Sequence, residues 1–477
     1  MRKKGSVTVF LTLILSLLLS LICASIESVR MASARTQILN GMDIGLYSLF
    51  GQYDKELLTD YDLFALDGSG GGGQLDLAAV CDELEAYMNP VLKQNSQKLT
   101  LCQSGLTGYR LLTDQKGEAF YQQIVGYMQE TLGSQGIQLL LGRMSERQEK
   151  TAQADQSANQ AQSKGSIDRY DSEMNQASEK SQQAAEEAQV VPQAPPARNP
   201  ITIMKRIMKR GVLELVLPGG NGLSTKAIEK GTLVSGRGLQ QGLEMPDGMT
   251  TENGYTSEVL FQQYLMEHLG SYAEPSSAGL AYQMEYIFGG KDSDEDNLKA
   301  VASKLLFIRE GVNFACLMAD NVKRSEAQAL ATAIASGFLV PPAAVIIEAA
   351  LILCWAFAES VLDVRELFAG GRIPLVKSSA DWQISLGNLP DLMEGLDSMR
   401  RNDEKGMSYN DYLQVLVLTV SKEKKVMRAM DMIENTIREK GRRNFCMDSC
   451  IVALEAFADV KANKKKDFQV IRQYCYE

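Results

Sequence analysis

Residues 5–26 read GSVTVFLTLILSLLLSLICASI and contain no charged side chain. The basic tip Arg2-Lys3-Lys4 precedes this stretch, and Glu27-Ser28-Val29-Arg30 follows it. A helix of this length measures roughly 33 Å, which is enough to cross the hydrocarbon core of a bilayer. The sequence therefore predicts a transmembrane helix over residues 6–26.

A cleaved secretory signal is the alternative interpretation of the apolar stretch. The stretch is longer than the h-region of ~7–15 residues that such signals carry, and no small-x-small site before a turn ends it. Because Lys and Arg precede it, the positive-inside rule places residues 1–5 in the cytoplasm and the bulk of the chain outside. We therefore expect a single-pass protein of the cell membrane, with membrane lipid as a partner and an extracytoplasmic ectodomain.

A second helical pattern follows the anchor without a break. Apolar side chains recur at steps of three and four residues, at Met42, Leu46, Leu49, Phe50, Tyr53 and Leu57. This spacing places them on one face of a helix. We expect one long helix whose first half lies in lipid and whose second half packs onto a soluble domain.

The composition excludes several classes of function. The formal net charge of −10 argues against binding to nucleic acid, whose backbone demands a basic face. His268 is the only histidine, so multi-histidine metal sites are excluded. Its place at the end of a helical run indicates a cation at a helix C-terminus. The eight cysteines include no Cys-x-x-Cys pair, so zinc ribbons and thioredoxin chemistry find no support.

The last three cysteines leave two alternatives open. Cys446 and Cys450 are an even number of residues apart, so on one strand they share a face and cannot bond to each other. Cys475 on a neighbouring strand could form a disulfide with one of them. Unpaired buried thiols are the other possibility.

The pattern of the whole chain predicts an α+β fold with a small antiparallel sheet and a mainly helical C-terminal half. Within residues 27–144 we expect two strands and two helices, at Tyr61–Asp67, Lys98–Leu112, Leu77–Lys93 and Gly117–Met144. Alternation at the end of the chain predicts strands over 445–460 and 468–476. These strands could complete one sheet, onto which the first helix packs.

Residues 145–199 differ from their surroundings in composition. They are rich in Gln, Ser, Ala, Glu and Lys and contain almost no large apolar side chain. Such a segment cannot bury enough surface to offset its ordering entropy. We expect a low-complexity linker, helical at best in part, between the two parts of the ectodomain, 27–144 and 200–477.

Helices predominate in the second part of the ectodomain. Ser293 and Asp296 form a capping box for a helix that follows them, and Pro275 suits the first turn of a helix that runs to Phe288. Further helices are expected at 408–420 and 422–440.

The segment Ala327–Val361 is the second apolar region. Beyond the break at Pro341-Pro342, four acidic residues fall within about 60° of one another on a helix, namely Glu348, Glu359, Asp363 and Glu366. Charges on one face favour a packed helical hairpin with a solvent-exposed side. A second membrane crossing is the alternative.

No template for catalysis or ligand binding is complete. Gly289-Gly290-Lys291 lacks the first glycine and the Ser/Thr of a phosphate-binding loop. Asp292, Asp294 and Asp296 imitate half of a calcium loop, but Asn297 replaces its turn glycine, so helix capping explains these acids better. We therefore predict no enzyme, no cofactor, no catalytic or metal-binding residue and no small-molecule substrate.

Gly5-Ser6-Val7-Thr8-Val9-Phe10, which opens the apolar helix after basic residues, resembles the pilin-type N-terminus of TadE/TadG-like proteins. Those are membrane-anchored pseudopilins of the tight-adherence (Tad, or Flp) pilus system. Other stretches resemble an uncharacterised bacterial family of such anchored proteins, namely 26–30 (IESVR), 61–67 (YDLFALD), 285–291 (EYIFGGK), 308–313 (IREGVN) and 355–360 (WAFAES). The resemblance covers most of the chain except residues 145–199 and brings no known chemistry.

The resemblance implies an accessory subunit rather than the fibre itself. In prepilin-type ends, peptidase cleavage follows the glycine, and a Glu five residues later pairs with a neighbour's new amino terminus. Phe10 stands at that place here. We therefore expect a non-catalytic component of pilus assembly whose partners are other pilus-assembly proteins. A surface adhesion or ligand-binding ectodomain on a membrane anchor is the alternative, and an envelope enzyme is a second alternative.

Overall fold

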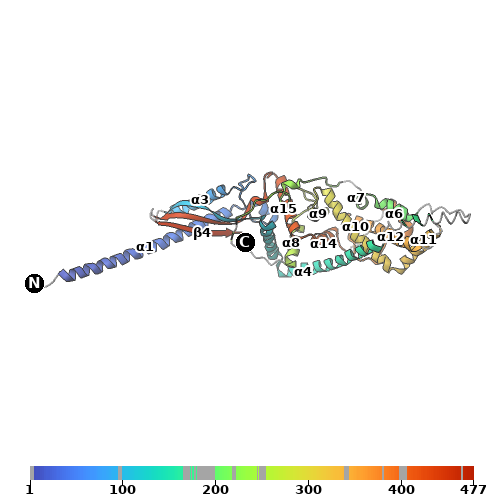
Figure 1. Cartoon of the computed structure of the whole chain (residues 1–477), viewed down its shortest axis with the longest axis horizontal. Helices are drawn as coiled ribbons and strands as arrows, with labels where there is room; N and C mark the ends of the chain where they lie inside the picture. Colours follow the sequence, from blue (N-terminus) through green and yellow to red (C-terminus); the bar gives the residue numbers. More distant parts are fainter. Residues whose placement is uncertain are drawn as a thin grey trace. The chain divides into compact units, whose positions relative to one another are not determined.

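The computed structural model describes most of the chain, over residues 5–94, 99–164, 172, 175–176, 179, 199–217, 222–243, 245, 254–337, 343–378, 381–396, 406–462 and 466–476. Two compact units make up this fold, and the chain passes between them more than once. Unit 1 comprises Met1–Tyr127, Gly236–Glu252 and Ile437–Glu477, and unit 2 comprises Met128–Ser235 and Asn253–Thr436. Figure 1 follows the elements by colour along the sequence.

Unit 1 contains an antiparallel sheet of four strands in the described part of the chain. The strands are β1 (Leu66–Asp67), β2 (Leu99–Leu111), β3 (Cys450–Ala462) and β4 (Lys466–Cys475). β3 is central, because β2 pairs along one of its edges and β1 and β4 pair with the other. The prediction that segments from both ends of the chain share one sheet is confirmed.

Two helices cover one face of this sheet. α1 (Gly5–Phe50) runs along the strands, and α3 (Leu77–Lys93) lies beside it (Figure 1). Side chains from the helices and from every second residue of β3 form one core, which includes Ile38, Met42, Leu46, Leu84, Met88, Leu454, Ala456, Ala458 and Val460. The small residues of β3 leave room for the helices, and the alternation is that of a half-buried strand.

Two expectations about the borders of these elements need correction. β3 begins at Cys450 rather than at 445, because a short 3-10 turn, η5 (Met447–Ser449), precedes it. Tyr61 ends a helix, α2 (Lys55–Tyr61), so only Leu66–Asp67 of the expected strand is extended in the sheet. The apolar side chains of the expected strand nevertheless lie in the interior. Those of Tyr61, Leu63, Ala65 and Leu66 are all buried.

The apolar stripe expected to continue from Met42 to Leu57 is divided between two helices. α1 ends at Phe50, and the side chain of Asp54 caps α2 by accepting hydrogen bonds from the backbone of Glu56 and Leu57. Asp54 thereby satisfies two of the unpaired donors of a helix start. The stripe still contributes to the interior on both sides of the break.

Unit 2 is mainly helical. Its elements are α6 (Pro200–Met208), α7 (Val212–Val216), η1 (Lys230–Thr232), α8 (Tyr255–His268), α9 (Gln283–Gly289), α10 (Asp294–Ala319), α11 (Asn321–Gly337), α12 (Ala344–Phe368), η4 (Leu386–Asp391), α13 (Leu392–Gly395), α14 (Tyr409–Leu418) and most of α15 (Lys422–Glu439). α12 is the central helix of the unit and packs against α10 and α11. Helices predominate here as the sequence predicts.

α4 (Asp114–Lys164) begins in unit 1 and continues into unit 2. It includes the start of the predicted linker, where Thr151 and Ala154 are buried and Asp155 forms an ion pair with Lys304 at 2.7 Å. The described start of the expected linker is therefore helical and packs against the folded unit at Thr151 and Ala154. Most of the remaining linker, 165–198, lies outside the described residues.

Of the two helix starts predicted from local signals in unit 2, one is confirmed. Ser293 caps α10 by accepting from the backbone of Asp296, and Ser408 with Asp411 forms a full capping box for α14. Pro275 does not start a helix, so that prediction was wrong: α9 begins only at Gln283. The segment before α9 is held instead by hydrogen bonds of Ala281 and Tyr282 to the buried carboxylate of Asp294.

The acidic face of α12 is solvent-exposed only in part, which corrects a further expectation: Glu348 and Glu366 are half-buried. Glu359 and Asp363 are only 1% exposed. α11 and α12 do form the predicted packed pair. Their intervening Pro341-Pro342 lies outside the described residues. α12 is long and apolar enough to cross a membrane, but 78% of its apolar window is buried inside the protein.

Candidate functional site

The first half of α1 is apolar and exposed on all sides. Leu17 is 63% exposed, and its neighbours from Val7 to Val29 are similarly open. Val7–Phe50 is a helix long and apolar enough to span a membrane, and its most apolar window is 0% buried. Such a surface is unusual in water and typical of a segment that contacts lipid or another apolar surface.

The polar side chains of this half are satisfied within the helix. Four hydroxyls donate hydrogen bonds to backbone carbonyls three or four residues earlier, those of Thr12, Ser16, Ser20 and Ser25, at 2.8–2.9 Å. An apolar environment offers no water to pair these groups, so internal pairing is what a lipid-embedded helix requires.

The second half of the same helix is buried in unit 1. From Ala34 to Phe50 one face becomes inaccessible to solvent, and Leu46 is only 1% exposed. Gly41 and Gly45 lie where α3 approaches: a Cβ on Gly45 would lie 2.6 Å from Cγ of Met88. A single helix therefore provides an exposed apolar rod and part of a folded core.

The end of α1 is fixed to β4. The hydroxyl of Tyr476 donates a hydrogen bond of 2.6 Å to the carbonyl of Phe50. The Phe50 ring lies 4.8 Å from the ring of Tyr474 and 4.8 Å from that of Tyr476. Arg472 forms an exposed ion pair with Asp43 at 2.9 Å. These contacts join the exposed rod to the sheet through its buried half.

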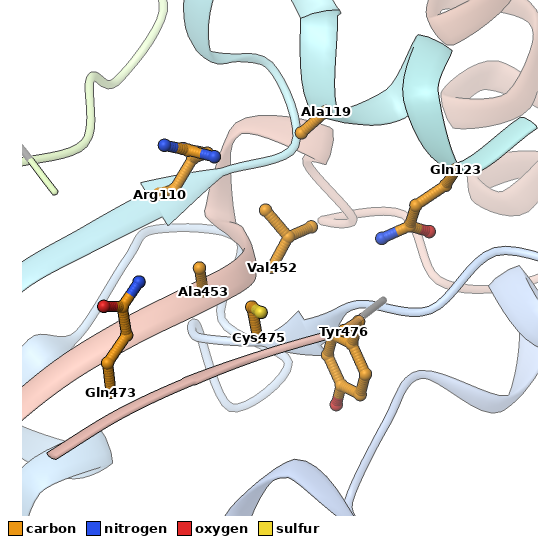
Figure 2. A pocket seen from close by; sticks show the side chains of 8 residues that line it. All are labelled: Arg110, Ala119, Gln123, Val452, Ala453, Gln473, Cys475 and Tyr476. Carbon is orange, nitrogen blue, oxygen red and sulfur yellow. The ribbon is translucent and has the colours of Figure 1, made fainter. Parts of the chain in front are cut away.

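A small hollow lies on the other side of the sheet. Figure 2 shows its lining by Ala119 and Gln123 of α4, Arg110 of β2, and residues of β3 and the chain end, namely Val452, Ala453, Gln473, Cys475 and Tyr476. Its volume of about 20 Å³ is enough for one or two water molecules. Organic ligands occupy pockets of roughly 300 Å³ or more. This hollow is therefore too small to hold an organic substrate.

A fully buried cluster of charges lies in unit 2. Nζ of Lys377 lies 2.6 Å from Oε1 of Glu359 and 2.5 Å from Oδ1 of Asp363, both on α12. Arg309 of α10 donates to Oδ2 of Asp363 through Nε at 3.1 Å and Nη2 at 2.9 Å. The side chains of all four residues are at most 1% exposed. Two cations and two carboxylates thus neutralise each other away from water.

Neutral polar groups complete the cluster. Asn313 donates to Oδ2 of Asp363 and to Oγ of Ser360, each at 2.9 Å. Nη1 of Arg309 donates to the carbonyls of Pro374 and Leu375. Burial raises the pKa of the Asp363 carboxyl, but the charges of Arg309 and Lys377 outweigh burial and hold that pKa below its ordinary value. The two cations beside Asp363 therefore favour its ionised form.

A second buried carboxyl behaves differently. Oε1 of Glu285 accepts hydrogen bonds from the hydroxyl of Tyr409 at 2.5 Å and the backbone of Tyr272 at 2.8 Å. Among the described residues, Oε2 of Glu285 has no hydrogen-bond partner. Burial is the main cause that raises the pKa of Glu285 to about 7. Within the described part of the chain, Glu285 has no cationic partner of the kind that favours ionisation of Asp363.

The residues examined for chemistry in the sequence have structural roles. His268 ends α8 as expected, with its ring stacked on Tyr264. Gly290 is the C-cap of α9 and has a left-handed backbone conformation (φ 60°). This conformation favours glycine, so the residue is explained without a phosphate-binding role. Asp296 takes part in the cap of α10, as expected: its backbone donates to Oγ of Ser293, and its side chain accepts from the hydroxyl of Ser293. Within the described ranges, no three His, Cys, Asp or Glu residues come together as metal ligands.

The cysteines of the described chain form no disulfide. Cys446 precedes β3 at the start of η5, so it does not share a strand with Cys450 as expected. Cys475 pairs across the sheet with Ala453 rather than with a cysteine. Of the two alternatives, a disulfide or thiols, the described cysteines are thiols.

Residues 192–462 match the model of a family of unknown function, DUF5702. The chain belongs to this family. The DUF5702 match contains the whole charge cluster of unit 2 and β3 of the sheet, whereas α1 and β4 lie outside it. Neither a curated protein nor a solved structure matches the chain.

Two of the five stretches that carry the resemblance, 308–313 and 355–360, meet in the interior of the DUF5702 region. Arg309 and Asn313 come from 308–313, and Glu359 and Ser360 from 355–360. No motif surrounds Lys377, so local sequence patterns could not identify this residue. A buried helix with acids at steps of four and three residues was the available signal, because such acids require cationic partners.

Proposed function

We propose that this chain is a non-catalytic, membrane-anchored envelope protein that acts as an accessory, pseudopilin-like component of Tad/Flp-type pilus assembly. The observation that carries the proposal is α1, an exposed apolar rod that continues without a break into the core of a helix-on-sheet unit. Such a helix can hold the folded unit at a membrane and present it to partners there.

An accessory role fits the start of α1 better than a role as the main fibre subunit. Phe10 is 64% exposed on the helix, and residues 5–26 contain no carboxylate. A buried amino terminus in a filament needs such a carboxylate as its partner, because an unpaired charge in an apolar environment costs several kcal/mol. The proposed partners are therefore membrane lipid and other pilus-assembly proteins, contacted at the extracytoplasmic side of the membrane.

Copurification from crosslinked cells tests this function. A full-length tagged chain should capture pilus-assembly proteins, and capture should be lost when a generic transmembrane helix replaces residues 5–26 while membrane location is retained. Deletion of the gene should reduce piliation or adhesion. If pili, adhesion and secretion are all unchanged by the deletion, the proposal is wrong.

A surface-binding ectodomain remains the second candidate, favoured by one observation. Ile471 is 49% exposed and pairs in register with Phe457. Because Val470 belongs to the core under α1, Ile471 points to the opposite face of the sheet. Binding of the full chain to wall or host surface material, lost in an Ile471→Lys variant and without capture of pilus proteins, would favour this candidate.

A further inference from the structure

The position of Lys377 between two carboxylates has a chemical consequence beyond charge neutralisation. Its nitrogen is within 2.6 Å of both Glu359 and Asp363, and the side chains are shielded from water. The Lys377 nitrogen also lies 5.6 Å from the centre of the Trp382 ring. A nucleophile, a carboxyl and a second carboxylate that can carry protons are therefore held together in a dry, partly aromatic environment.

We propose that Lys377 and Asp363 condense into an intramolecular isopeptide bond, with Glu359 as the proton carrier. The bond would join α12 covalently to the segment that follows it, 373–378. This inference is independent of the proposed pilus function, since it concerns the chemistry inside unit 2 alone.

The contacts of Asp363 select it as the acyl group. Three donors converge on its Oδ2, namely Nε and Nη2 of Arg309 and Nδ2 of Asn313, at 2.9–3.1 Å. An oxygen with this many donors is prepared for the negative charge of a tetrahedral intermediate. The other oxygen, Oδ1, faces the Lys377 nitrogen at 2.5 Å. Oδ2 therefore remains as the amide carbonyl, and Oδ1 is the leaving oxygen.

The contacts of Glu359 suit a proton carrier. Its oxygens accept hydrogen bonds from the backbone of Gln383 at 3.2–3.3 Å and of Ile384 at 3.0 Å. These bonds fix the carboxylate beside the ammonium of Lys377. A general base must lie within about 2.6–3.2 Å of the atom that it deprotonates, and Oε1 meets this requirement.

The condensation is balanced without an oxidant or co-reactant. Glu359 carries two protons in turn from Nζ of Lys377 to Oδ1 of Asp363. The electron pair of Nζ forms a bond to Cγ, and the Cγ–Oδ1 bond breaks with its electrons on the departing water. One ammonium and one carboxylate become one amide and one water. Arg309 and Glu359 remain as opposite charges, so the buried site stays neutral.

Two physical effects favour the step. Fixed reacting groups can have effective molarities of about 10⁵–10⁸ M, which offsets the unfavourable condensation of free amines and acids in water. Conversion of a buried ion pair to an amide also removes the cost of keeping two charges away from water. No such arrangement surrounds Lys425, which is buried but faces the single carboxylate of Glu258 at 3.3 Å.

Mass spectrometry of the full chain, extracted in detergent, tests the bond. The denatured protein should weigh less than its sequence by one water molecule. Trypsin should not cut after Lys377, and residues 373–400 should appear as a branched peptide joined to residues 325–365. A measured mass equal to that of the sequence, together with tryptic cleavage after Lys377, would overturn the proposal. A link to Glu359 in place of Asp363 would overturn the assignment of the acyl group.

Variants separate the roles of the three residues. Asp363→Asn should give the same branched peptide, because the amide leaves as ammonia in place of water. Glu359→Gln should lose the branch, and Lys425→Met should keep it as the matched control. If Glu359→Gln fails to fold, the wild-type and Asp363→Asn peptide maps still decide the question. A branch that persists in folded Glu359→Gln would contradict the role of Glu359.

Discussion

The hydroxyl of Tyr476 donates a hydrogen bond of 2.6 Å to the carbonyl of Phe50, the last residue of α1. This contact joins the C-terminal strand segment to the helix that begins the described chain. It also satisfies one of the carbonyls that every helix leaves unpaired at its end. The exposed apolar rod is therefore held by a part of the sequence more than four hundred residues away.

Tyr476→Phe should reduce the free energy of unfolding of unit 1 by about 0.5–1.5 kcal/mol, because the ring contact is kept and the hydrogen bond is lost. Urea titration followed by tyrosine fluorescence measures the change. Tyr47→Phe is the matched control, since Tyr47 is 68% exposed. Equal effects of the two changes would contradict a specific role for the hydrogen bond.

Gly45→Val should destabilise unit 1 by about 1–3 kcal/mol, because the new side chain would enter the space of Met88 and separate α1 from α3. Thermal unfolding by circular dichroism measures this. Gly142→Val is the control, since Gly142 is also helical and a Cβ there meets nothing within 4 Å. A Gly45→Val protein as stable as that control would show that α3 can move aside at little cost.

Local patterns predicted the regular elements well. Leu77–Lys93 was predicted as a helix with the borders that α3 has. In the structure the side chain of Asp76 caps this helix, and Val80, Leu84 and Met88 are buried at helical spacing. Strands β2, β3 and β4 were predicted within a few residues from their alternation. The packing of α1 on the sheet followed from the apolar stripe that continues beyond residue 26.

Long-range pairing explains what the sequence could not reveal. The acids of α12 were interpreted as a solvated face, but Arg309 and Lys377 lie 54 and 14 positions from Asp363 and reach it only in the folded unit. The role of Asp294 in holding residues 281–282 is hidden for the same reason. Local spacing shows which side chains share a face, whereas the partners of that face come from tertiary structure.

Arg309→Met should lower the free energy of unfolding of unit 2 by about 3–5 kcal/mol, because removal of one cation leaves an uncompensated charge in the buried cluster. Arg472→Met removes a cation from an exposed pair with Asp43 and should cost about 0–1 kcal/mol. Chemical denaturation of both variants measures the difference. A loss below about 1 kcal/mol in Arg309→Met would show that the cluster rearranges or admits water.

Glu285 should make unit 2 less stable as the pH rises from about 4.5 to about 7. The pKa of Glu285 is raised from 4.5 to about 7 by burial, so in this window the folded state holds a proton that the unfolded state has released. Stability therefore falls with increasing pH, by about 2–3 kcal/mol over the window.

Glu285→Gln should remove this part of the pH dependence and keep the acceptor for Tyr409 and Tyr272. Urea midpoints at several pH values across the window measure it. Glu274→Gln, which changes an exposed carboxylate near the same segment, should leave the pH dependence as in the wild type. A Glu285→Gln profile parallel to the wild type would show that Glu285 ionises normally.

Leu17→Arg should release the chain from the membrane fraction. Leu17 is at the middle of the uncharged stretch, and a charged side chain at the centre of a spanning helix costs about 2.5–3.5 kcal/mol on insertion scales. Val29→Arg is the matched control, because Val29 is equally open on the same helix but lies beyond residue 26, beside Arg30. Alkaline extraction of membranes should leave the wild type and Val29→Arg in the pellet and move a large share of Leu17→Arg to the supernatant. Release of the wild type by the same treatment would show that the exposed half of α1 is covered by a protein partner rather than by lipid.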